Sequence, residues 1–172
     1  QVFWTASPLL LMERFGLGAH GIALFAFAGA GGALVAPLAG RLADRGHTRV
    51  ATGAALALAI AAFGLGAAAA HWHSLAGLVI AALVVDAAVQ MCQVLSLRSL
   101  FMLAPETRGR INGLFMAFVF VCGAAGSGLA AAVYAFDGWS AVCALGAAFG
   151  AAALAFYFTE QRGARPAAVL AP

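Results

Sequence analysis

Long runs of apolar residues, separated by short polar links, occupy most of this chain. A helix needs about 20 such residues to cross a membrane, because each residue advances it by about 1.5 Å through a hydrocarbon layer of about 30 Å. Five runs reach that length, at positions 21–40, 50–70, 74–97, 111–136 and 138–159. Because the links are short, we expect consecutive helices to be antiparallel neighbours. The pattern predicts an all-α, polytopic membrane helix bundle.

The first apolar run, which ends at Met12, is long enough for only about half of a bilayer. It carries Pro8 near its middle and stops at Glu13 and Arg14. Because the chain does not begin with methionine, we interpret this run as the remainder of a truncated span rather than as a re-entrant segment. The prediction is then about six spans within residues 1–160, followed by a short tail at 161–172.

The composition indicates that lipid surrounds most of the surface. Hydrophobic residues make up 65% of the 172 positions and charged residues only 9%, with a mean hydropathy of +1.00. A soluble domain of this size needs more charge to cover its exterior. The three cysteines lie inside apolar runs without a metal-ligand spacing, and the sequence has no phosphate-binding loop. We therefore expect neither a metal nor a cofactor.

Arginine supplies all nine basic residues, and its distribution predicts the orientation in the membrane. Eight of the nine fall at one set of span ends, namely Arg41, Arg45, Arg49, Arg98, Arg108, Arg110, Arg162 and Arg165. The other ends carry Arg14, Trp72 and Trp139. The positive-inside rule places the arginine-rich ends and the C-terminus in the cytoplasm, and both tryptophans at the outer interface. Arginines confined to the links do not predict a nucleic-acid partner.

Asp86 is the only charged residue within the run 74–97 and lies midway along it. An ionised carboxylate at the bilayer centre costs roughly 2.5 kcal/mol or more, so such residues usually face an aqueous cavity or stay protonated. Gln90 and Gln93 follow four and seven residues later, on the same helical face. We interpret the three as cavity lining, with Asp86 binding a proton or a cationic substrate group. The alternative is a permanently protonated carboxyl that links two helices.

The link between the runs 21–40 and 50–70 combines glycines with charges. Gly40 and Gly46 suit a tight turn, and Asp44 and Arg45 can pair across it or meet a helix terminus, ahead of Arg49. A merely solvated loop is the alternative.

Two further groups of residues leave alternatives open. Gly123, Gly126 and Gly128 are predicted to permit close helix packing, or else a bend. Trp4 and Thr5 line a cavity, or Trp4 is an interfacial anchor.

The link at 40–49 resembles the loop signature of the major facilitator superfamily, in which a glycine is followed after three residues by Asp-Arg and then by glycine and basic residues. Here Gly46 follows Arg45 directly, and His47-Thr48 replaces a basic pair. Residues 3–11 resemble that family's seventh helix, residues 86–94 its tenth, and residues 108–128 its tenth-to-eleventh loop and eleventh helix. The bacterial arabinose-efflux-like and drug-efflux-like permeases are the subgroup that we suggest.

The resemblance implies the C-terminal six-helix half of a twelve-helix transporter in the bacterial inner membrane. It implies alternating access, with a small-molecule substrate and protons crossing between this half and a missing N-terminal half. It also implies that Asp44 and Arg45 help to hold the two halves in one conformation on the cytoplasmic side. We expect proton-coupled efflux. The alternatives are a non-transporting structural or assembly protein, a non-functional fragment and, last, a membrane-embedded enzyme, for which the spans carry no catalytic grouping.

Overall fold

Helices form all of the regular structure in the computed structural model, which describes residues 1–103 and 105–163. In chain order the elements are α1 (Val2–Phe15), α2 (Ala19–Gly29), the 3-10 helix η1 (Ala30–Val35), α3 (Ala36–Asp44), α4 (Thr48–His71), α5 (Leu75–Leu103), the 3-10 helix η2 (Pro105–Thr107) and α6 (Arg108–Gly163). Arg165 and most of the predicted tail lie outside the described residues. The fold is the expected all-α bundle.

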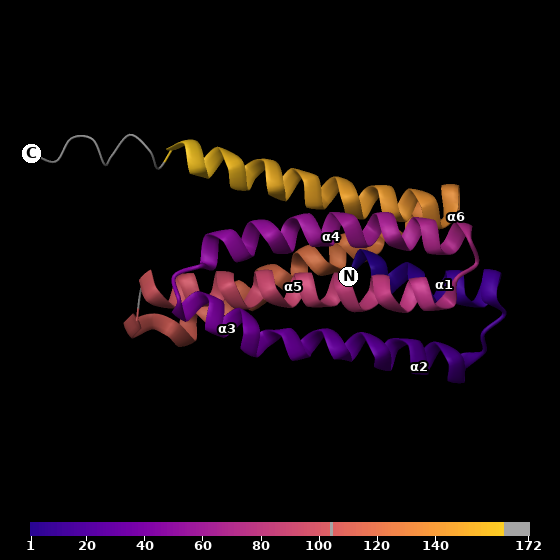
Figure 1. Ribbon diagram of the computed structural model, residues 1–172, viewed down its shortest axis with the longest axis horizontal. Coiled ribbons are helices and arrows are strands. Elements are labelled where there is room, and N and C mark those ends of the chain that lie inside the picture. Colours follow the sequence, from indigo (N-terminus) through magenta and orange to yellow (C-terminus); the bar gives the residue numbers. More distant parts are fainter. Residues whose placement is uncertain (104, 164–172) are drawn as a thin grey trace, which may run out of the picture.

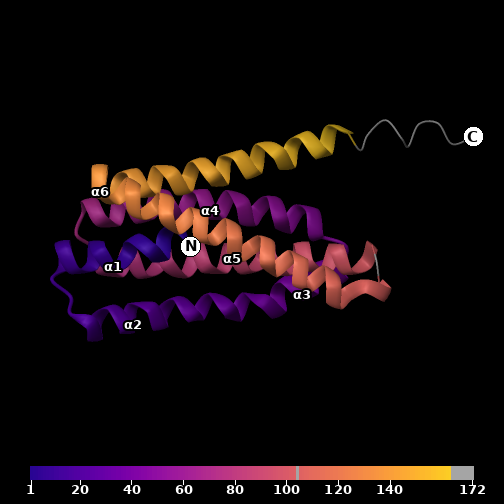
Figure 2. The same cartoon turned by 180° about the vertical axis from the view of Figure 1, so that it is seen from behind.

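The helices run side by side along one direction (Figures 1 and 2). In both views α2 and α3 lie on one side of the bundle and the last part of α6 on the opposite side, with α1, α4 and α5 between them. Gln1 lies near the middle of the bundle's length (Figure 2). The core is built largely from small and aliphatic residues of the central helices, including Ala6, Leu10, Ala62 and Leu78.

Four stretches within the described residues are long and apolar enough to cross a membrane. They are Ala19–Asp44, Thr48–His71, Leu75–Met102 and Arg108–Thr159. Side chains such as Phe27, Leu34 and Phe136 are more than four-fifths exposed, as expected for groups that lipid covers. These findings make the chain a multi-pass membrane protein.

The stretch predicted as one continuous span at 21–40 is interrupted at its centre. The α-helix stops at Gly29, six residues form η1, and α3 resumes with Pro37 in its first turn. Proline has no backbone N–H, and its ring clashes with the carbonyl four residues earlier, so it opposes a continuous α-helix here. Gly29, Gly31 and Gly32 add little helical preference of their own. The prediction of one continuous span is therefore wrong here, although the glycines and Pro37 carried the signal for a break.

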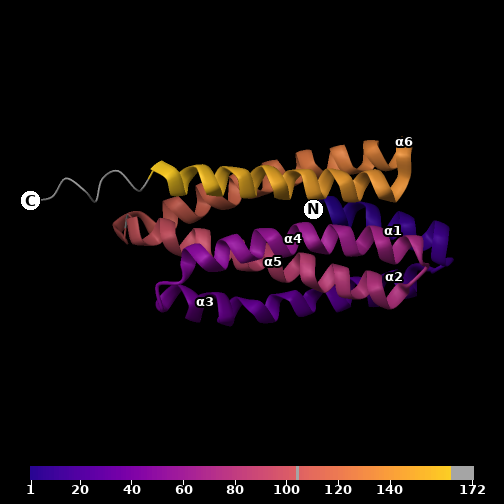
Figure 3. The ribbon, with the colours of Figure 1, turned by 45° about the horizontal axis from the view of Figure 1, so that its top comes forward.

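The two last predicted spans are two arms of α6, joined at Gly138. This residue has φ 69° and ψ −156°, a conformation accessible almost only to glycine. The chain reverses there, and the arms at 108–137 and 139–163 run antiparallel (Figure 3). Each arm packs against a different part of the bundle. The first packs on α1 at Gly126, and the second packs mainly on α4, at Gly146 and Gly150.

Small residues allow the close approach of α4 to the second arm of α6. A Cβ atom on Gly150 would lie 2.7 Å from Ile60 Cγ1, and one on Gly146 would enter the ring of Phe63. In lipid no hydrophobic force drives helices together, so close van der Waals contact of this kind supports their association.

We predict that Gly138→Ala destabilises the protein by about 1–3 kcal/mol, because alanine cannot adopt this backbone conformation without strain. Thermal unfolding of the purified chain in detergent measures the change. Gly128→Ala is the matched control, since this helical glycine of α6 has no atom within 4 Å of an added Cβ. Equal unfolding midpoints for both variants would show that the reversal does not depend on Gly138.

Candidate functional site

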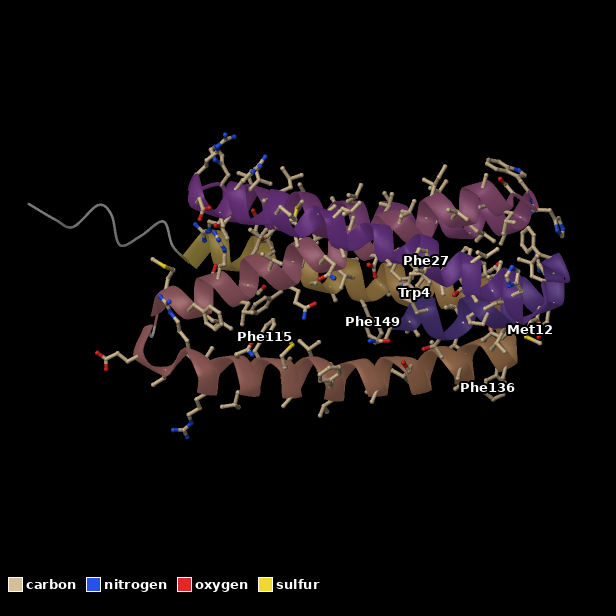
Figure 4. All side chains as sticks on the ribbon, turned by 90° about the horizontal axis from the view of Figure 1, so that it is seen from below. Trp4, Met12, Phe27, Phe115, Phe136 and Phe149 are labelled. Atoms are coloured by element: carbon tan, nitrogen blue, oxygen red, sulfur yellow. The ribbon has the colours of Figure 1, made fainter. Side chains whose placement is uncertain are left out.

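Asp86 lies near the middle of α5 and is half-buried. The indole Nε1 of Trp4, on α1, donates a hydrogen bond to its Oδ1 at 3.3 Å. This bond joins residues that are 82 positions apart and belong to different helices. A carboxyl group within the membrane-spanning region therefore has a polar partner from a neighbouring helix. Figure 4 places Trp4 near the middle of the bundle's length, so the chain uses it inside the bundle rather than as an interfacial anchor.

The interrupted helix passes directly over the same carboxyl group. A Cβ atom on Gly32 would lie 2.6 Å from Asp86 Cβ, 2.7 Å from its Oδ2 and 2.8 Å from the backbone nitrogen of Ala87. On the same segment, a Cβ atom on Gly29 would enter the ring of Trp4. Only glycine lets the end of α2 and η1 approach the Trp4–Asp86 pair. The pair therefore lies where α1, η1 and α5 meet.

Aromatic rings surround Trp4 on the other sides. Phe3 contacts it edge to face at 5.8 Å between ring centroids, and Phe25 of α2 does so at 5.9 Å. Both phenylalanines are buried. Edge-to-face packing of this kind restricts the indole ring, which keeps its N–H directed at Asp86.

Gln93 lies on the same side of α5 as Asp86 but reaches a different neighbour. Its Nε2 lies 3.6 Å from the sulfur of Met116, on the first arm of α6. It also lines an apolar cavity of about 300 Å³ between α4, α5 and α6, together with Phe115. Phe115 points from α6 toward α5 (Figure 4). Gln90 is half-buried between Asp86 and Gln93. The three predicted pathway residues thus share one side of α5, and of the three this cavity is lined by Gln93.

The glycines of the first α6 arm differ in what they face. An added Cβ would lie 3.0 Å from Gln1 Cγ at Gly123 and 3.5 Å from Val2 Cγ2 at Gly126, whereas Gly128 faces open space. Next to them, the Thr5 hydroxyl donates a hydrogen bond of 2.9 Å to the Ser127 hydroxyl. Two of the three predicted packing glycines therefore meet α1. For Gly128 helix packing stays a prediction.

At the arginine-rich end Asp44 pairs with Arg98 of α5, and not with the adjacent Arg45. Arg98 Nη1 donates both to Asp44 Oδ1 and to the backbone oxygen of Gly40, the latter at 3.0 Å. The pair therefore joins the end of α3 to α5. Sequence reasoning missed Arg98 as the partner, because only the packing of α3 on α5 brings the two together.

The link that follows Asp44 is a glycine turn. Gly46 has a φ of +75°, which favours glycine, and the backbone N–H of His47 donates to Leu42 O at 2.9 Å. Arg45 is exposed, and the backbone oxygen of Arg49 accepts a hydrogen bond from Tyr157 at 2.9 Å. The expected tight turn is present, and its two arginine side chains project from the end of the bundle.

The opposite end corrects one expectation. Trp72 is 74% exposed, as an interfacial residue should be, but Trp139 is only 4% exposed. Trp139 Nε1 donates to the backbone oxygen of Gly66 at 2.9 Å, and its ring contacts Phe3. An indole with its polar atom satisfied inside the bundle is a core residue. Its position beside the turn at Gly138 had suggested an anchor.

These features define a class: multi-pass helical membrane proteins with a carboxyl group held between helices and an ion pair across their arginine-rich end. A family model described as Major Facilitator Superfamily matches residues 1–170. The chain belongs to the Major Facilitator Superfamily.

Curated relatives carry transporter names. The chain is 34% identical over 154 residues to "Probable transporter SCO4007" of Streptomyces coelicolor, covering 87% of this chain and 34% of that protein. It is 33% identical over 112 residues to "Uncharacterized transporter YgaY" of Escherichia coli O157:H7, covering 63% and 27%. The chain thus spans about a third of the length of the relatives it matches. No solved structure matches.

We predict that Gly32→Ala destabilises the protein by about 1–3 kcal/mol, because the new methyl group overlaps Asp86 and the α5 backbone. Thermal unfolding in detergent measures this, with Gly64→Ala as control, because nothing lies within 4 Å of a Cβ added there. Equal stability of the two variants would contradict a close contact between η1 and α5.

Proposed function

We propose that this chain is the C-terminal half of a secondary transporter that exports a small molecule in exchange for protons by alternating access. Its partner is an N-terminal six-helix half, and its location is the bacterial inner membrane with the arginine-rich ends and the C-terminus in the cytoplasm. Membership of the superfamily supports transport rather than enzymatic catalysis. The observation that carries the coupling is the Trp4–Asp86 hydrogen bond beneath the interrupted helix.

Asp86 is the group that we propose carries the proton. It is the only acidic residue of α5, and it is half-buried far from the ends of the helix. Carboxyl groups retained at such depth in membrane helices commonly belong to ion or proton pathways, because holding them there is costly. The Trp4 N–H stabilises the ionised form as a hydrogen-bond donor and loses part of that interaction when Asp86 is protonated. Protonation of Asp86 therefore weakens the hydrogen bond that joins α1 to α5.

The interrupted helix supplies the element that responds. Short 3-10 stretches inside longer helices often mark hinges, because their hydrogen bonds are less favourable than those of the α-helix. Here η1 approaches Asp86 through Gly32, and the end of α2 just before it approaches Trp4 through Gly29. We propose that changes in the Trp4–Asp86 pair alter the bend between α2 and α3, and so the access to the pathway that Gln90 and Gln93 line.

The Asp44–Arg98 pair is the proposed gate at the cytoplasmic end. It joins α3, which continues from the hinge, to α5, which carries Asp86. Both side chains are largely exposed, at 67% for Asp44 and 45% for Arg98, so the pair is weak enough to break in each cycle. Arg45, Gly46 and Arg49 position this link.

We predict that Asp86→Asn abolishes substrate-driven proton movement, because the amide cannot bind and release a proton. The measurement is proton flux in proteoliposomes that contain this chain together with its N-terminal half. Glu13→Gln is the matched control, because it neutralises a carboxylate at the end of α1, whose partner is the hydroxyl of Tyr134.

Two comparisons make this test specific. Asp86→Asn should insert and unfold like the unaltered protein, so that a loss of flux reports coupling rather than folding. Trp4→Phe should reduce flux without abolishing it, because it keeps an aromatic ring and removes only the N–H donor. Normal proton flux in Asp86→Asn would reject the proposed role of this residue.

For the gate we predict that Asp44→Asn and Arg98→Gln change the transport rate by similar factors and that the double variant is no worse than either one. Each substitution removes the same pair, so their effects cannot add. The change should be within about fivefold, as expected of an exposed pair worth up to about 1 kcal/mol. Arg41→Gln, on α3 like Asp44, is the control. Additive effects of Asp44→Asn and Arg98→Gln in the double variant would refute the gate.

A further inference from the structure

An open cavity of about 530 Å³ lies at the arginine-rich end, between α3, α4, α5 and the start of α6. Its lining combines two arginines, one carboxylate, two hydroxyls and three apolar side chains, namely Arg98, Arg108, Asp44, Thr48, Ser99, Ala43, Phe101 and Met102. Two guanidinium groups against one carboxylate leave the lining with a formal charge of +1. The cavity is therefore suited to an anionic ligand.

Arg98, which lines this cavity, retains hydrogen-bonding capacity. A guanidinium group carries five N–H donors, and both of its bonds to the described residues, to Gly40 O and Asp44 Oδ1, use Nη1. The donors on Nη2 and Nε are thus left for another acceptor. Arginine forks match the oxygens of a phosphate group in geometry. Thr48, the first residue of α4, adds a hydroxyl and the positive end of a long helix.

The apolar part of the lining distinguishes a lipid from a free anion. Met102 is 78% exposed and Phe101 is half-buried, both at the end of α5. Around the cavity the same end of the bundle carries Arg45 and Arg49, both exposed. A phosphate-binding group with apolar side chains beside it, at the level where membrane helices end, has the amphipathic character of a lipid headgroup site.

We propose that this cavity binds the phosphate of an anionic phospholipid from the surrounding membrane, through Arg98 and Arg108. Because Asp44 holds the same guanidinium group, the lipid phosphate and the Asp44 carboxylate compete for Arg98. Lipid binding and the Asp44–Arg98 pair therefore oppose each other. The lipid site is independent of what the protein transports, because binding depends only on the groups that line the cavity.

The test is a titration of this chain, purified together with its N-terminal half in a neutral detergent, with short-chain phosphatidylglycerol. Bound lipid is counted by native mass spectrometry, and short-chain phosphatidylcholine and inorganic phosphate are titrated in parallel. We expect phosphatidylglycerol to bind much more tightly than either of the others. Loss of one arginine should weaken its binding by roughly fivefold, and loss of both, in Arg98→Gln with Arg108→Gln, by more than tenfold.

Two further variants control for folding and for total charge. Arg110→Gln removes an equal charge from the same helix, two residues from Arg108 and so on a different face, and should leave the affinity within about twofold. Asp44→Asn removes the competitor and should strengthen phosphatidylglycerol binding. Equal affinity for inorganic phosphate would show an anion site rather than a lipid site. Unchanged binding in the double arginine variant, or in Asp44→Asn, would overturn the proposal.

Discussion

The exclusion of water from the bilayer core is the constraint on which this structure depends. Backbone groups inside lipid must bond to one another, so the chain forms helices over nearly all of its described length, and polar side chains there need protein partners. Asp86 shows the consequence most clearly. Its carboxyl group is held by Trp4 from α1 and covered by η1 through Gly32. The side chain of Asp86 is thereby the point at which α1, η1 and α5 contact one another.

The interruption of the second helix lies at the same contact. On the observed backbone, a side chain at position 29 would overlap Trp4 and one at position 32 would overlap Asp86. The glycines remove the side chains, Pro37 disfavours the α-helical turn before it, and η1 results. Local sequence and tertiary packing therefore agree at this point. Because η1 continues directly into α3, the Asp86 carboxyl group is linked through this segment to the Asp44–Arg98 pair at the end of α3.

The arginine-rich end combines two roles in one side chain. Arg98 closes an ion pair with Asp44, and it also faces a cavity large enough for a phosphate-bearing headgroup. An exposed ion pair contributes little to stability, so Arg98 can leave Asp44 for another partner at low energetic cost. In the mechanism that we propose, the bundle is stabilised by apolar and small-residue packing, while the weak polar contacts at its centre and end change during function.

The sequence alone determined the helical class, the spacing of the spans and the alternation of arginine-rich and arginine-poor ends, because hydropathy and charge act along the chain. It could not predict that Asp44 pairs with Arg98, that Trp139 is buried, or that Gly146 and Gly150 lie in close contact with α4. Helices that are apolar on every side carry no periodic mark of which face meets a neighbour. Tertiary structure decided those contacts, since they join residues distant in sequence whose pairing depends on how whole helices lie together.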